Sequence, residues 1–93
     1  MAEIKELLPI GSVVLLQGGI RKLMIIGIKQ FTEENPGVEY DYSAVLYPEG
    51  FLGKNTMFLF QHSDINDVIF RGYSNPEREK FIEKAQEIYE EQN

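Results

Sequence analysis

Residues 38–47 alternate between apolar or aromatic side chains and mostly polar ones, and this alternation constrains the fold more than any other feature of the chain. One face carries Val38, Tyr40, Tyr42, Ala44 and Leu46, and the other carries Glu39, Asp41, Ser43, Val45 and Tyr47. Such a period is typical of a β-strand that buries one face and leaves the other largely in water. We therefore expect a half-exposed antiparallel strand here, and the rest of the chain has to supply its partners.

Two glycines link the first two predicted strands. Residues 12–17 are β-branched and apolar on both faces, as in a central strand, and residues 21–29 form a second apolar run. Gly18 and Gly19 stand between the runs, which favours a hairpin because both positions tolerate positive φ. Gly27, inside the second run, indicates a bulge or a sharp bend.

Beyond the alternating segment, the chain predicts two further short strands. Pro48 and Gly50 mark a turn, since proline presets φ and glycine accepts a positive value. Residues 56–61 have the composition of a fourth strand and residues 67–71 that of a fifth. Residues 62–66 between them begin with polar side chains and indicate one tight helical turn.

Residues 75–91 predict a helix. Asn75 is a suitable N-cap, and Pro76 suits the first helical position. An apolar stripe at helical spacing is expected to dock on the sheet as core; it consists of Phe81, Ile82, Ala85, Ile88 and Tyr89. Residues 1–10 are interpreted as a short lead-in, in which Pro9 ends any helical turn.

These elements predict one domain over residues 1–93, mainly β with α+β character. A chain of 93 residues is too short for two cores of useful size. Five short antiparallel strands, a tight turn before the fifth and a closing helix favour a strongly bent SH3-like barrel. An open five-stranded sheet with the helix across one face is the alternative.

Composition excludes several classes of site. The chain contains no cysteine, which rules out disulfides, thiolate zinc sites and a cysteine nucleophile and fits a reducing compartment. The longest apolar run, residues 23–28, is far shorter than the roughly 20 residues of a spanning helix. The charged N-terminus does not resemble a signal peptide. We expect a cytoplasmic protein without a membrane association, and co-export with a partner stays open.

The sequence predicts no catalytic, cofactor or metal-binding residues, and so a non-enzymatic protein. His62 is the only histidine. The adjacent residues His62, Ser63 and Asp64 include the residue types of a triad, but neighbours on a tight turn cannot form one line of hydrogen bonds. His62, Asp64 and Asp67 are too few for zinc without cysteine, and calcium would need a denser acidic loop.

The charge balance disfavours nucleic acid as a partner. The formal net charge is −6, and the basic residues are spread along the chain rather than gathered. The alternative function, a nucleic-acid-binding SH3-like barrel, would depend on Arg21, Lys22 and Lys29 around the first hairpin.

An aromatic loop after the alternating strand is the candidate protein-binding patch. Tyr47, Phe51 and Leu52 lie in a stretch rich in turn-forming residues, and loops usually run over the surface. Rigid aromatic side chains there would serve as anchors for a partner protein. The alternative is that Phe51 and Leu52 fold back and plug the end of the barrel.

Six segments together resemble a small domain-of-unknown-function family of Gram-positive bacteria, and the similarity covers nearly the whole chain. They are residues 8–19 (LPIGSVVLLQGG), 22–27 (KLMIIG), 40–42 (YDY), 46–50 (LYPEG), 64–65 (DI) and 70–73 (FRGY). Members are often encoded beside LXG-type toxins and other components of type VII secretion. The resemblance transfers no catalytic residues. It implies an accessory role, such as a chaperone or adaptor that holds an LXG toxin or a targeting factor before export. The sequence leaves the oligomeric state open.

Overall fold

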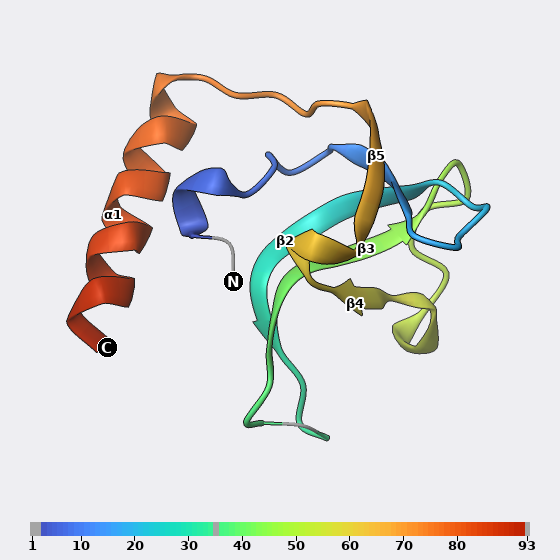
Figure 1. Ribbon diagram of the computed structural model, residues 1–93, viewed down its shortest axis with the longest axis horizontal. Helices are drawn as coiled ribbons and strands as arrows, with labels where there is room; N and C mark the ends of the chain where they lie inside the picture. Colours follow the sequence, from blue (N-terminus) through green and yellow to red (C-terminus); the bar gives the residue numbers. More distant parts are fainter. Residues whose placement is uncertain (1–2, 35, 93) are drawn as a thin grey trace.

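The computed structural model of the chain describes residues 3–34 and 36–92. Each strand expected from the sequence is present, with ends that differ by a few residues. The elements, in chain order, are η1 (Ile4–Glu6), β1 (Val13–Leu16), β2 (Leu23–Phe31), β3 (Glu39–Leu46), η2 (Lys54–Thr56), β4 (Phe58–Phe60), η3 (His62–Asp64), β5 (Ile65–Phe70) and α1 (Pro76–Gln92) (Figure 1).

The five strands form one open antiparallel sheet in the order β4-β3-β2-β1-β5. In the described part of the chain β4 and β5 do not pair with each other, so the sheet is not closed into a barrel. In a flat sheet these two edges would lie four strand spacings, about 19 Å, apart. The single turn of η3 connects them and rises only about 6 Å. The sheet is therefore strongly bent, as the sequence predicted.

Gly27 contributes to this bend. The register of β2 against β3 shifts between Ile25 and Gly27, which places a bulge in the longest strand. A Cβ on Gly27 would lie 2.6 Å from the Ser43 side-chain oxygen on β3, so a larger residue does not fit without rearrangement. The bend expected at this glycine is confirmed.

The core lies on one face of the bent sheet, and the N-terminal segment completes it. The strands contribute Val14, Leu23, Ile25, Tyr42, Ala44 and Phe60. Ile4, Leu7 and Leu8 are also fully buried in this cluster. The interpretation of residues 1–10 as a mere lead-in is therefore wrong, because three of their apolar side chains are core.

The helix is correctly predicted but docks on a different surface. Asn75 Oδ1 accepts a hydrogen bond from the Arg78 backbone N–H at 2.9 Å, which confirms the N-cap. However, α1 packs against η1 rather than across the sheet (Figure 1). Phe81 and Ile88 of the apolar stripe are 61% and 45% exposed. The stripe is narrower than expected because the N-terminal segment lies between the helix and the strands.

Candidate protein-binding surface

The turn that contains His62 is held by structural contacts. His62 Nδ1 lies 2.7 Å from the Tyr42 hydroxyl, whose oxygen accepts a hydrogen bond from the Leu8 N–H at 2.8 Å. Asp64 Oδ2 accepts from the Gln61 N–H at 2.9 Å and caps the turn. These contacts are those of a polar turn that joins the N-terminal segment to the sheet. Among residues 3–34 and 36–92 there is no cluster of three or more histidine, aspartate or glutamate residues that could hold a metal ion.

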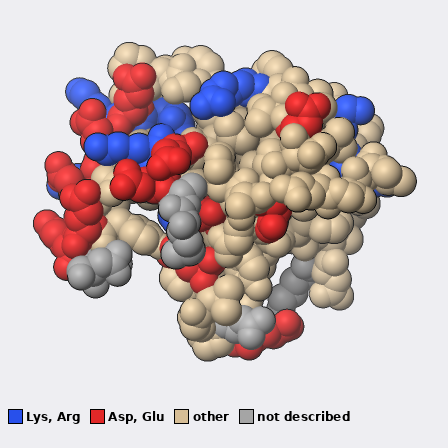
Figure 2. Space-filling view, viewed as in Figure 1, with Lys and Arg blue, Asp and Glu red and all other residues tan. Residues whose placement is uncertain are grey.

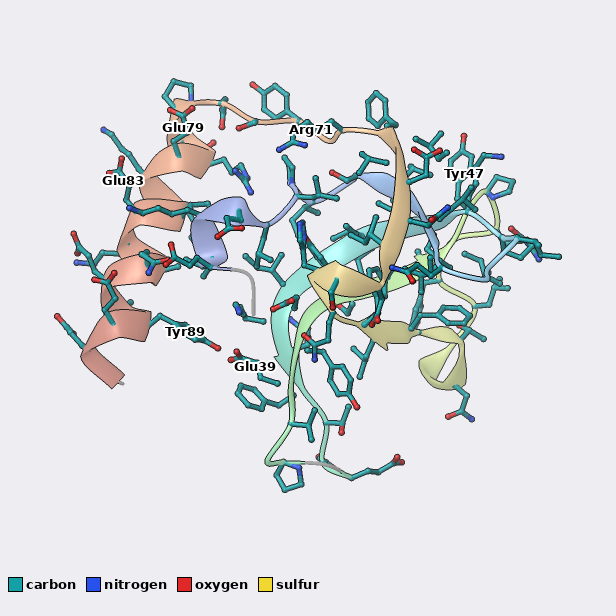
Figure 3. All side chains as sticks on the ribbon, viewed as in Figure 1. Glu39, Tyr47, Arg71, Glu79, Glu83 and Tyr89 are labelled. Carbon is teal, nitrogen blue, oxygen red and sulfur yellow. The ribbon has the colours of Figure 1, made fainter. Side chains whose placement is uncertain are left out.

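A largely buried ion-pair network lies beside this turn. Lys29 Nζ is 3.0 Å from Asp41 Oδ1 and 3.5 Å from Glu39 Oε1, and the Lys29 and Asp41 side chains are only 10% and 3% exposed. Asp41 Oδ2 also accepts from the His62 N–H at 2.8 Å. The Lys29 ammonium lies 5.2 Å from the centre of the Tyr89 ring, and Tyr89 reaches from α1 toward Glu39 (Figure 3). The network thus connects α1 with β2 and β3.

Burial is the main cause that raises the pKa of Tyr42 to about 12, because the charged phenolate would be poorly solvated. The negative charge of Asp41 acts in the same direction, and the hydrogen bond from Leu8 opposes it. The neutral hydroxyl is therefore the form that holds the N-terminal segment and His62 in place.

Raising the pH from about 10 to about 12 is expected to weaken the fold through Tyr42. The folded protein keeps the phenolic proton up to a pKa of about 12, whereas an ordinary tyrosine releases it near 10.0. Between these values the native state binds more protons, so the contribution is fully present below pH 10 and disappears as the pH rises through 12. The free energy of unfolding should fall by up to about 2.7 kcal/mol. Urea unfolding of the wild type and Tyr42→Phe at several pH values tests this, and identical slopes against pH would contradict it.

The three basic residues considered for nucleic-acid binding do not form a free cationic patch. Arg21 is paired with Glu49, and this hydrogen bond holds the pKa of the Glu49 carboxyl below its usual value. Lys29 is largely buried by its carboxylate partners. Only Lys22 of the three is exposed without a salt bridge to the described residues. On the face shown in Figure 2, charged side chains of both signs gather over α1, while the surface over the sheet is largely uncharged.

The loop after β3 closes on itself and exposes its apolar residues. Gly50 takes a φ of 82° and its N–H donates to the Leu46 carbonyl at 2.7 Å, which confirms the turn. The Thr56 hydroxyl donates to the Gly53 carbonyl at 2.6 Å, and its oxygen accepts from the Leu52 N–H at 3.2 Å. Phe51 and Leu52 are each 60% exposed. The alternative in which they plug the end of the sheet is therefore wrong.

Tyr47 lies on a different part of this surface from Phe51 and Leu52. Its side chain is 47% exposed at the end of the sheet away from α1 (Figure 3). There it lines an apolar groove of about 430 Å³, which we call the Tyr47 groove. The other lining residues are Gly11, Val13, Lys22, Met24, Ile69 and Phe70. Thus the structure brings Tyr47 together with β1, β2 and β5, and places Phe51 and Leu52 outside the groove lining.

A match to a known family covers most of the chain. Residues 7–81 match the family described as Domain of unknown function (DUF4176). The chain belongs to this family. No curated protein and no solved structure matches the chain. The DUF4176 match contains every residue of the Tyr47 groove and all five strands, and it ends inside α1, one residue before the buried Ile82.

The DUF4176 domain exposes the apolar residues of β5. Val68, Ile69 and Phe70 are 41%, 44% and 61% exposed. Sequence reasoning missed Met24, Ile69 and Phe70 as residues that line the Tyr47 groove. The residues of β5 alone carried no signal for their exposure, because it follows from the place of β5 at the edge of the sheet. Within the described ranges, no helix is long and apolar enough to cross a membrane.

Proposed function

We propose that this DUF4176 protein is a non-enzymatic module that binds another protein through the exposed aromatic loop and the Tyr47 groove. The observation that carries the proposal is the 60% exposure of both Phe51 and Leu52 in a loop closed by its own hydrogen bonds. Large apolar side chains held at a surface are typical of protein-protein contact sites. Aromatic anchors of this kind supply much of the binding energy of such contacts.

The proposed partner is an LXG toxin or its targeting factor. This part of the proposal follows from the family resemblance, whose members are encoded beside LXG toxins and type VII secretion components. The chain would act in the cytoplasm as a chaperone or adaptor before export of the toxin. An exposed apolar surface suits this role, because it can cover an apolar segment of the partner until the partner is handed on.

The nucleic-acid alternative has less support. Two of its three basic residues, Arg21 and Lys29, already have carboxylate partners. Phosphate binding would have to break these pairs or depend on Lys22 alone, and affinity for a phosphate backbone grows with the number of cations that contact it.

Replacing Phe51 and Leu52 together by alanine is expected to weaken partner binding about tenfold or more, because the two anchors are lost. The circular dichroism spectrum should stay native, since both side chains are exposed. The partner is first recovered by affinity purification from the native host and identified by mass spectrometry, with an LXG toxin as the expected result. Titration calorimetry then measures the affinity of each variant.

The matched control is Phe81→Ala with Ile88→Ala on α1. This pair also combines an aromatic and an aliphatic residue, and both are exposed, at 61% and 45%. The control should bind the partner as the wild type does. If the loop variant unfolds, or if both double variants bind equally well, the loop is not the contact surface.

A further inference from the structure

β5 is the longer of the two edge strands of the sheet, and its pairing with β1 contains two register shifts. It pairs only with β1 in the described part of the chain, and every residue after Ile65 is exposed. The other edge strand, β4, has only three residues, and a short edge gives another chain little to pair with. The six residues of β5 include neither lysine nor proline, which commonly block edge pairing. Of the two edges, β5 is therefore the more open to a further extended segment.

The pairing register of β5 with β1 shows which side chains such a segment would contact. Asp67 lies opposite Leu15 on β1, and Phe70 lies opposite Val13. Leu15 and Val13 are two residues apart in β1 and share a face. Asp67 and Phe70 are three residues apart, but the register shift between Val13 and Val14 adds one residue on β5, so Asp67 and Phe70 also share that face. Phe70 also lines the Tyr47 groove at the side nearest the sheet edge. A strand beside β5 would place one side chain against Phe70 and another beside Asp67.

Charge favours a basic segment over a second copy of this chain. Asp67 is exposed and has no salt bridge to the described residues. The chain as a whole carries a net charge of −6. A cationic side chain opposite Asp67 is stabilising, whereas pairing β5 with its own copy would bring two acidic chains together. Lys22, the one basic residue in the groove lining, precedes β2, which lies two strands away from β5 in the sheet.

We infer that β5 binds an extended segment of the partner protein by β-strand addition. The segment carries an apolar side chain against Phe70 and a lysine or arginine opposite Asp67. Main-chain hydrogen bonds along the free edge hold the segment, and the groove and Asp67 select its side chains. The inference rests on the proposed function, since it specifies which kind of segment the partner presents.

Selection from a displayed library of random short peptides tests this inference. The enriched peptides should carry an apolar residue and a lysine or arginine at a fixed spacing from each other, on the same face of the bound strand. In spectra of ¹⁵N-labelled protein, an enriched synthetic peptide should shift the amide resonances of β5. Methylating the two peptide amides that face β5 should weaken binding about tenfold, because it removes main-chain donors without changing side chains.

A charge reversal at Asp67 tests the side-chain selection. Asp67→Lys should weaken binding of the basic peptides roughly fivefold, and a repeated selection should enrich acidic residues at the same place. Glu83→Lys is the matched control, because it changes the net charge by the same amount on α1 (Figure 3). This control should leave both the affinity and the selected pattern unchanged.

Several results would overturn the inference: no enriched pattern, unshifted β5 amides, no effect of amide methylation, or equal effects of Asp67→Lys and Glu83→Lys. A dimer of the free chain in sedimentation equilibrium that Phe70→Asp dissociates would name a second copy as the occupant instead. A failure of strand addition can be distinguished from a failure of the proposed function. If the partner recovered from the host binds Asp67→Lys normally but binds the Phe51 and Leu52 double variant weakly, protein binding stands and only strand addition is lost.

Discussion

Replacing Gly72 by alanine is expected to lower the free energy of unfolding by about 3 kcal/mol. A Cβ at this position would lie 2.3 Å from the Ile10 carbonyl oxygen and 2.9 Å from the Ser12 backbone nitrogen. Both neighbours are main-chain atoms, so no side-chain rotation can relieve the overlap. The Gly72 N–H donates to Ser12 Oγ at 2.9 Å, and the same hydroxyl donates to the Pro9 carbonyl at 2.7 Å. Moving the chains apart would break these bonds and pull the N-terminal segment from the core.

Gly37→Ala is the matched control for this substitution. Its added Cβ would meet nothing within 4 Å, so stability should change by less than about 0.5 kcal/mol. Urea unfolding followed by circular dichroism gives both values. Equal midpoints for the two variants would contradict a tight chain crossing at Gly72.

Local features of this chain were predictable from the sequence. The alternation in residues 38–47 specified the strand β3, because side-chain direction in a strand depends only on position along it. The prediction that one face of this strand lies largely in water is wrong, since Asp41, Ser43 and Val45 on that face are each only 2% exposed. Asn75 and Gly50 specified the start of α1 and the turn after β3 for similarly local reasons: a side-chain cap and a positive φ. These signals need no knowledge of distant residues.

The docking of α1 was not predictable in this way. An apolar stripe indicates which side of a helix is buried, but not which segment packs against it. Here the cover comes from the N-terminus. Arg78 Nη2 donates to the Leu7 carbonyl at 3.2 Å across 71 residues of sequence, and Ser12 meets Gly72 across 60. In a segment as short as the N-terminal one, the apolar residues give too weak a pattern to predict such contacts.

The candidate site was also predictable only in part. Phe51 and Leu52 could be nominated from the sequence because aromatic residues in a turn-rich loop stand out. Their exposure could not be decided, since it depends on how Thr56 closes the loop. The contribution of Ile69 and Phe70 to the Tyr47 groove depends on strand order, which makes β5 an edge. Strand order is a property of the whole sheet, and the composition of five or six residues does not reveal it.

Replacing Lys29 by methionine is expected to destabilise the fold by about 3 kcal/mol. The substitution keeps most of the side-chain volume but leaves the Asp41 carboxylate, which is 3% exposed, without its cation. A buried charge that loses its partner costs more than the pair contributed, because its desolvation is no longer offset. The contact between Lys29 and the Tyr89 ring is lost as well, so α1 should fray. Urea unfolding gives the loss in stability, and hydrogen exchange of the α1 amides reports the fraying.

Two controls separate buried charge from lost packing. Arg21→Met breaks an ion pair with Glu49 whose side chains are 51% and 37% exposed, and this should cost less than about 1 kcal/mol. Adding Asp41→Asn to Lys29→Met removes the unpaired charge and should restore part of the stability, since an asparagine oxygen can still accept from the His62 N–H. If the double variant is as unstable as Lys29→Met alone, the contact with Tyr89 rather than the ion pair connects α1 to the sheet.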